Sequence, residues 1–158
     1  DWVRAGAVDF GFVSPNAAKG LETTFIKSGR FCAVLPKDHP LTARKLLTLE
    51  DFDGEPFLLL EEGAYSEPLE AFHAAGITPN VKLRVHDDYS ILSMVEQGLG
   101  ISVLTELVLR KTSYDVVTLP IEQAIIRTMG IVTKDKKALP LASKEFIRYL
   151  LKYRESML

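Results

Sequence analysis

The sequence predicts an α/β fold made of two bodies. Short runs rich in β-branched and aromatic residues alternate with stretches of helical periodicity, and this alternation is typical of α/β layouts. Two places argue against a single sheet: the segment from Pro36 to Pro40 is a poor continuation of a central strand, and the chain changes direction again at Leu104 and Thr105. We therefore expect one body from residues 36–104, a second from the remaining residues, and a ligand cleft between them.

The expected strands are apolar or β-branched runs bounded by turn signals. The run from Val8 to Val13 stops at a Ser-Pro-Asn turn, and residues 57–60 are wholly apolar, as in a strand covered on both faces. Residues 81–85 alternate apolar and charged side chains, which indicates a strand with one wetter face. The complete set of expected strands is 8–13, 31–35, 57–60, 81–85, 101–104, 116–119 and 128–133.

The expected helices follow from cap residues, glycine stops and apolar stripes. Ser66 has the place of an N-cap, with a proline in the first turn behind it. Ile91, Leu92, Val95 and Leu99 have the spacing of one buried helix face. The complete set of expected helices is 1–5, 48–52, 66–75, 87–98, 105–110 and a last helix that begins at 143.

Composition excludes several classes of protein. Nineteen Lys and Arg against 21 Asp and Glu give a formal charge of −2 and a pI near 6.0, so the basic excess of an isolated nucleic-acid-binding domain is absent. One cysteine, Cys32, excludes an internal disulfide and a Cys-rich zinc module, and it suits a reducing cytosol. No apolar run approaches the roughly 20 residues of a membrane span.

The histidines, the cysteine and the glycine motifs offer no catalytic or metal site. His39, His73 and His86 lie in separate predicted segments and never at the spacing of a helical metal pair. Cys32 lies inside an apolar strand, where a thiol is usually a small core residue. The Gly-x-Gly at residues 98–100 closes a helix instead of opening one, so its amides would not face a pyrophosphate.

Two acidic pairs allow two interpretations. Glu61-Glu62 and Asp87-Asp88 suggest general acid/base chemistry, as in glycosidases. Each pair also directly precedes a predicted helix, where carboxylates bond free backbone N–H groups and complement the helix dipole. We favour the capping interpretation.

The loops behind the two best-defined strands predict a binding site. One leads from residues 57–60 through Glu61 to Ser66, and the other leads from 81–85 through Asp87 to Ser90. Ligands of open α/β sheets bind at the carboxyl ends of strands, near helix N-termini that attract anions. We expect a small ligand that carries a carboxylate or similar anion, next to the side chains of Tyr65, Ser66 and Tyr89.

Four segments, in this order and spacing, are similar to one family. They are residues 2–13 (Trp-Val-Arg-Ala-Gly-Ala-Val-Asp-Phe-Gly-Phe-Val), 34–41 (Val-Leu-Pro-Lys-Asp-His-Pro-Leu), 49–57 (Leu-Glu-Asp-Phe-Asp-Gly-Glu-Pro-Phe) and 95–104 (Val-Glu-Gln-Gly-Leu-Gly-Ile-Ser-Val-Leu). Together they resemble the effector-binding domain of LysR-type transcriptional regulators, and the resemblance extends over essentially the whole chain. Each segment alone is weakly specific, whereas the ordered set is specific.

The resemblance implies a type 2 periplasmic-binding-protein-like fold, in which two α/β subdomains are joined by two crossover strands around a ligand cleft. Residues 1–35 and 105–158 would form subdomain I, and residues 36–104 subdomain II. The chain opens on Asp1 without an initiator Met or a signal-like stretch, and the resemblance implies that the start of subdomain I and a winged helix-turn-helix precede it.

The resemblance also carries the effector site over onto particular residues. These are Ser14 and Pro15 in a first-lobe loop, Gly63, Ala64, Tyr65 and Ser66 in a second-lobe loop and helix start, and Asp88 and Tyr89 at the start of the helix that leads to Gly98. The chain departs from the family at Thr105, where relatives commonly have proline, so we expect a less rigid second crossover.

The implied function is the sensing of a small metabolite, which controls DNA binding by the missing domain within a homodimer or homotetramer. The implied protein is cytoplasmic, is not an enzyme, needs no cofactor or metal and does not enter a membrane. A periplasmic solute-binding protein of the same fold is the alternative; it predicts an export signal upstream, where a regulator predicts a winged helix-turn-helix. An enzyme of this architecture has no support, because no nucleophile, base and orienting residue fall on converging loops.

Overall fold

The computed structural model describes residues 1–63, 65–110 and 113–157, and it confirms a mixed α/β fold. The strands are β1 (Phe10–Val13), β2 (Glu22–Pro36), β3 (Pro56–Leu60), β4 (Asn80–Val85), β5 (Ser102–Thr105), β6 (Val116–Pro120) and β7 (Ile126–Thr133). The α-helices are α1 (Trp2–Ala5), α2 (Glu67–Ala74), α3 (Asp88–Glu96), α4 (Glu106–Leu109) and α5 (Leu141–Met157). Single 3-10 turns cover Pro15–Ala17, Pro40–Ala43 and Leu49–Phe52.

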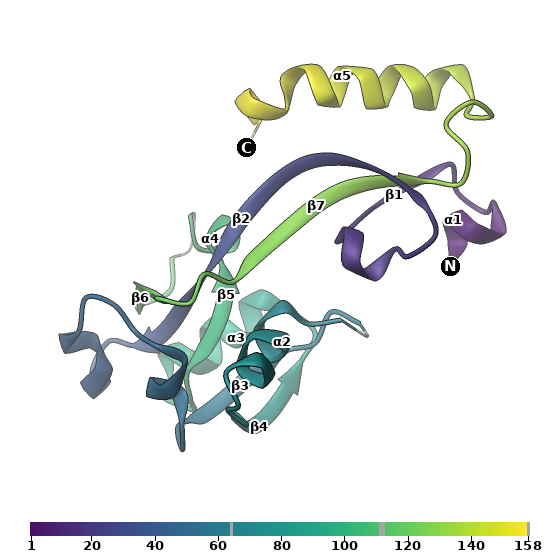
Figure 1. The fold of residues 1–158 in the computed structure, drawn as a ribbon. Coiled ribbons are helices and arrows are strands. Elements are labelled where there is room, and N and C mark those ends of the chain that lie inside the picture. The colour runs from purple at the N-terminus through teal and green to yellow at the C-terminus, as the bar shows by residue number, and fades with distance from the viewer. Residues whose placement is uncertain (64, 111–112, 158) are drawn as a thin grey trace. The chain divides into compact units, whose positions relative to one another are not determined.

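The chain divides into two compact units, one made of Asp1–Ser28 with Thr128–Leu158 and the other of Gly29–Arg127. Strands β2 and β7 run from one unit into the other (Figure 1). The subdomain boundaries expected from the sequence, at 36 and 104, are placed differently from this division and stay a prediction. No helix among the described residues is long and apolar enough to cross a membrane.

In the Gly29–Arg127 unit, the second half of β2 is flanked by two antiparallel strands. Cys32 of β2 lies opposite Leu104 of β5 on one side and Pro120 of β6 on the other. β3 and β4 pair in parallel, and β3 is tied to the segment before β5 because the Leu58 N–H donates to the Ile101 carbonyl at 2.9 Å. Figure 1 shows α2 and α3 beside this parallel pair. These strands form the support of the candidate site.

Aromatic and aliphatic side chains fill the core of this unit. The rings of Phe52, Phe57 and Phe72 pack edge to face, with centroids 5.4 to 6.1 Å apart. Phe72 lies on α2, so this cluster fixes the helix against the sheet. On the other side of β3, the predicted stripe of α3 is confirmed for Ile91, Leu92 and Val95, which are fully buried. The fourth member was wrong: Leu99 lies beyond the helix end and is 55% exposed.

In the unit of Asp1–Ser28 and Thr128–Leu158, β7 lies between β1 and β2. Phe10 of β1 lies opposite Thr133 of β7 and stacks on Phe146 of α5, with ring centroids 5.4 Å apart. Helix α5 lies along these strands (Figure 1). Val3, Ala18 and Val132 form a small core, with Val13 and Leu21 packed against it. In α5, Phe146 is exposed and the apolar residues Ile147, Leu150 and Leu151 are half-buried.

Several predicted elements have bounds in the structure that differ from the expected ones. The strand expected at 31–35 is the end of the much longer β2, whose first half carries alternating polar residues and lacks an apolar run. The helix expected at 48–52 is a 3-10 turn over Leu49–Phe52. Asp51 accepts a hydrogen bond from the Thr48 N–H at 2.9 Å, and the chain turns again at Gly54, where φ is +75°. The last helix begins at Leu141, two residues before the expected position.

Candidate functional site

The parallel pairing of β3 and β4 brings two loops to the same edge of the sheet. Leu60 lies opposite Val85, and the Glu61 N–H donates to the Val85 carbonyl at 2.8 Å. One residue further, His86 Nδ1 lies 2.7 Å from the Glu61 carbonyl. The loop in front of α2 and the start of α3 are therefore neighbours, as the strand order implied.

Both helix N-termini at this edge already hold partners from the chain itself. Ser66 Oγ accepts a hydrogen bond from the Leu69 N–H at 3.4 Å, and Pro68 has no N–H to offer. Asp87 accepts from the hydroxyl and the backbone N–H of Ser90, each at 2.7 Å, and these bonds hold the Asp87 pKa below its ordinary value. At both helix ends, side chains of the protein itself thus already take hydrogen bonds that an anion was expected to accept.

The capping interpretation of the acidic pairs is confirmed for one pair and wrong for the other. Asp87 caps α3, whereas Glu61 pairs with Arg84 at 3.3 Å and Glu62 pairs with Arg127. Ser66 has taken the capping position of α2, so the two glutamates are free to reach cationic side chains across the sheet edge.

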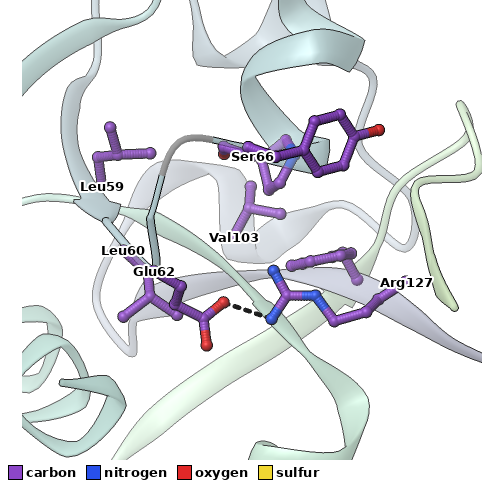
Figure 2. A pocket seen from close by; sticks show the side chains of 9 residues that line it. Leu59, Leu60, Glu62, Ser66, Val103 and Arg127 are labelled. Atoms are coloured by element: carbon purple, nitrogen blue, oxygen red, sulfur yellow. Dashed lines mark hydrogen bonds and ion pairs between the residues drawn. The ribbon is translucent and has the colours of Figure 1, made fainter. Parts of the chain in front are cut away.

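A narrow pocket opens beside this edge. It is lined by Phe31, Leu59, Leu60, Glu62, Tyr65, Ser66, Pro68, Val103 and Arg127. Figure 2 shows Leu59, Leu60 and Val103 around the pocket and the Glu62 carboxylate directed at the Arg127 guanidinium. The volume in which the centre of a water molecule fits is about 10 Å³, which is roughly the room for one water. A ligand that binds here must therefore displace a side chain.

Arg127 is the centre of the polar part of this pocket. Its Nη2 donates to Glu67 Oε2 at 2.9 Å and its Nε donates to Glu67 Oε1 at 3.4 Å, so Glu67 is held in the bidentate manner typical of Arg and carboxylate. Its Nη1 donates to Glu62. The guanidinium carbon lies 4.9 Å from the centroid of the Phe31 ring, within cation–π range.

The two carboxylates differ in burial. The side chain of Glu67 is 6% exposed and that of Glu62 is 40% exposed, while that of Arg127 is 19% exposed. Burial alone lowers the pKa of Arg127, but the hydrogen bonds that Arg127 donates to Glu67 and Glu62, together with their negative charges, outweigh it, and the pKa lies above its ordinary value. The guanidinium therefore stays charged in its pocket.

Asp88 adds a third carboxylate to this surrounding. Its pKa is raised, first by burial and then by the charge of Glu62, while Arg127 lowers it in part. Arg127 thus pairs with two carboxylates, and the charge of a third, Asp88, is close enough to be affected by both Glu62 and Arg127.

Comparison with known proteins decides the family. The sequence matches the family described as LysR substrate binding domain over residues 1–155. The chain belongs to this LysR family. Its type 2 periplasmic-binding-protein-like fold agrees with the prediction.

Among relatives of the LysR domain, the uncharacterized HTH-type transcriptional regulator YvbU of Bacillus subtilis (strain 168) is 28% identical over 149 residues, which are 93% of this chain and 51% of the relative. The transcriptional activator protein LysR of Escherichia coli (strain K12) is 32% identical over 110 residues, which are 68% of this chain and 35% of the relative. The chain thus spans about half the length of YvbU and about a third of the length of LysR.

Solved structures show the same fold. The regulatory domain of CcmR from Synechocystis PCC6803, in complex with 2-PG, superposes with a TM-score of 0.84 at 22% identity over 99% of this chain and 78% of that chain. The effector binding domain of QuiR, in complex with shikimate, gives 0.83 at 21% identity over 99% and 77% of the two chains.

The predicted effector residues of the LysR domain lie in different parts of the structure. Tyr65 and Ser66 line the pocket, and Gly63 lies in the loop behind Glu62, with a φ of +121° that favours glycine. Asp88 is half-buried near Glu62, whereas Tyr89 is 61% exposed. Ser14 and Pro15 lie half-buried in the other unit, at a 3-10 turn, and Ala64 lies outside the described residues.

Seven residues that line the pocket of the LysR domain are not among the predicted effector residues: Phe31, Leu59, Leu60, Glu62, Pro68, Val103 and Arg127. Glu67, the buried partner of Arg127, was also not predicted. The only signal for Arg127 is a basic residue behind the apolar pair Ile125-Ile126 at the start of a strand, which many surface strands share. In the sequence, Glu67 is an ordinary acidic residue of a first helical turn. Its burial could not be predicted without knowledge of its partner, Arg127.

Proposed function

We propose that this LysR domain binds a small anionic metabolite at Arg127, and that in a longer regulator this binding controls DNA binding by a winged helix-turn-helix outside the chain. The observation that carries the proposal is a permanently charged, mostly buried guanidinium that faces a pocket in a domain of this family. Arginine is suited to carboxylate and phosphate groups because its planar fork donates two parallel hydrogen bonds.

The structures of relatives support the class of ligand. CcmR was crystallised with 2-PG and QuiR with shikimate, each in a domain that superposes over nearly the whole chain. Both are small molecules, and we expect a ligand of similar size here. Admission of such a ligand requires the side chains of the narrow pocket to rearrange, because the present space holds about one water molecule.

We propose effector contacts for residues on the pocket wall and near it. Tyr65 and Ser66 offer hydroxyl groups on the pocket wall, Gly63 allows the loop its turn, and Asp88 accepts a hydroxyl of the ligand. Ala64 and Tyr89 remain proposals from the family resemblance, as do Ser14 and Pro15 in the other unit.

The signal would pass along β7. Arg127 is the last residue of the Gly29–Arg127 unit, and Thr128 begins the other unit on the same strand. A ligand shifts a conformational equilibrium only by its difference in affinity for the two states. We propose that an effector bound at Arg127 makes different contacts in two conformations of β7, which would give it such a difference.

The assembly and location follow the family resemblance. We propose a cytoplasmic homodimer or homotetramer that contacts DNA only through the other domain, with no catalytic activity. The named relatives are transcriptional regulators, which favours this role over that of a periplasmic solute-binding protein.

Calorimetric and thermal-shift screening of the full-length regulator tests the proposal. Each carboxylic acid is paired with its methyl ester, and shikimate with its ester is the first pair. Acids that bind, whose esters do not, and that change the affinity for operator DNA support the proposal. A preference for uncharged or cationic ligands overturns the anionic class, and ligands that leave DNA binding unchanged overturn the regulatory role.

A further inference from the structure

The two carboxylates on Arg127 hold it with unequal strength. Glu67 takes two N–H groups through both of its oxygens and is 6% exposed, while Glu62 takes one N–H group and is 40% exposed. Glu67 lies in the first turn of α2, next to Pro68, whereas Glu62 lies in the loop before Gly63. One carboxylate is therefore built into the helix and the other reaches in from a loop.

The guanidinium also keeps N–H groups that neither glutamate engages. Of its five N–H groups, three are engaged by these two glutamates among the described residues. The other two belong to Nη1 and Nη2, one on each nitrogen. A ligand carboxylate at Nη1 would lie beside the Glu62 carboxylate, and the repulsion between these like charges makes the two compete for Arg127.

We infer that Glu62 is a built-in competitor of the effector: an anionic group of the ligand replaces the Glu62 carboxylate on Arg127, while Glu67 keeps the guanidinium in position. This inference rests on the proposed function. It adds a mechanism by which Glu62 closes the site without ligand and the ligand opens it. Because only an anionic group compensates Arg127 for the lost partner, neutral analogues leave the pocket closed.

The burial of the three side chains explains the direction of the exchange. The released Glu62 carboxylate is already part exposed and is solvated as it leaves, so its removal from Arg127 has a small cost. The removal of Glu67 would leave a carboxylate that is 6% exposed without its partner. The departure of Glu62 also takes a negative charge away from Asp88, whose pKa that charge helps to raise.

Titration of the isotope-labelled chain with acetate, observed by NMR at the Nε–H of Arg127, tests the inference. Acetamide serves as the neutral probe of equal size. We expect Glu62→Gln to bind acetate about fivefold more tightly than wild type, since about 1 kcal/mol of ion pairing no longer opposes it, and Glu62→Ala to act in the same direction. The control Glu61→Gln removes the same charge one residue away, from a pair with Arg84, and leaves the acetate affinity unchanged.

Two further readouts separate exchange from a general charge effect. In Glu62→Gln the pKa of Asp88 falls, and Arg127→Lys loses the gain in acetate affinity. Equal affinities in wild type and Glu62→Gln, or the same gain in Glu61→Gln, overturn the inference. A gain in Glu62→Gln together with a failed metabolite screen would instead overturn the proposed function and leave the exchange standing.

Discussion

Single residues of this domain show how burial determines the contribution of an ion pair to stability. Glu62 and Glu67 share one arginine, yet the first is 40% exposed and the second is 6% exposed. An exposed ion pair contributes little because water screens it, whereas the loss of one partner of a buried pair leaves an unpaired charge. The two glutamates should therefore separate in their effect on stability.

Glu67→Ala should lower the free energy of unfolding by about 1–3 kcal/mol, because Arg127 then keeps only the weaker of its carboxylates. Glu62→Ala should lower it by less than about 1 kcal/mol. Urea denaturation of both variants measures the difference. Equal losses would show that the burial of the two pairs is not what distinguishes them.

Cys32 should react slowly with alkylating reagents. Burial and the nearby carboxylate of Glu106, whose Oε1 lies 3.8 Å from Sγ, raise the pKa of Cys32 from 9.0 to about 11. The thiolate fraction at pH 8 is then about a hundredfold below that of a thiol with pKa 9, since each pH unit changes it tenfold.

Iodoacetamide labelling followed by mass spectrometry checks this expectation. The rate should keep rising with pH up to about 11 and should increase at pH 8 in Glu106→Gln, which removes one of the two causes. A plateau near pH 9 would contradict it. The sequence places Cys32 in a strand, but it gives no sign that Glu106 is its neighbour.

At the scale of elements, the sequence predicts those whose signals are local. Ser66 and Asp87 cap the helices that the sequence placed behind them, and Ile91, Leu92 and Val95 are buried as their spacing requires. The first half of β2 was missed, because its polar residues become a strand only through pairing with distant β7. Long-range pairing of this kind has no signature in a short window of sequence.

Glycine is required for different reasons at the two glycine positions of the Gln-Gly-Leu-Gly segment. Gly98 ends α3 with a φ of +73°, as expected of a helix stop. Gly100 has no such φ; a Cβ at this position would lie 2.4 Å from the Pro56 carbonyl oxygen. The Ile101 N–H bonds to that same carbonyl at 2.8 Å, so the close approach fastens β3, which carries the pocket loop.

Gly100→Ala should therefore lower the free energy of unfolding by about 1–3 kcal/mol, because β3 or the glycine backbone must shift. Gly29→Ala is a matched control: a Cβ there meets nothing within 4 Å. Thermal unfolding of both variants provides the comparison. A Gly100→Ala variant as stable as Gly29→Ala would show that the Pro56 carbonyl yields at little cost.

At the scale of the whole molecule, family membership and fold followed from four ordered segments, while the lining of the candidate pocket followed only in part. Tyr65 and Ser66 were expected at the pocket and line it, since they lie in the loop that ends a strand. Arg127 lies about sixty residues further on in the sequence, at the start of β7, and only the folded chain brings it to Glu62 and Glu67. Contacts between distant segments cannot be predicted from motifs that lie within one segment.

The central claim is that Arg127 binds an anionic effector, and calorimetric titration of wild type and Arg127→Gln with the acids of the screen tests it most directly. Arg127→Lys, which keeps the charge without the planar fork, is the control for fold and charge. We predict that at least one acid binds wild type, that its methyl ester does not, and that Arg127→Gln weakens the acid at least about tenfold. Acids that bind Arg127→Gln as tightly as wild type, or a screen in which only esters and amines bind, would contradict the claim.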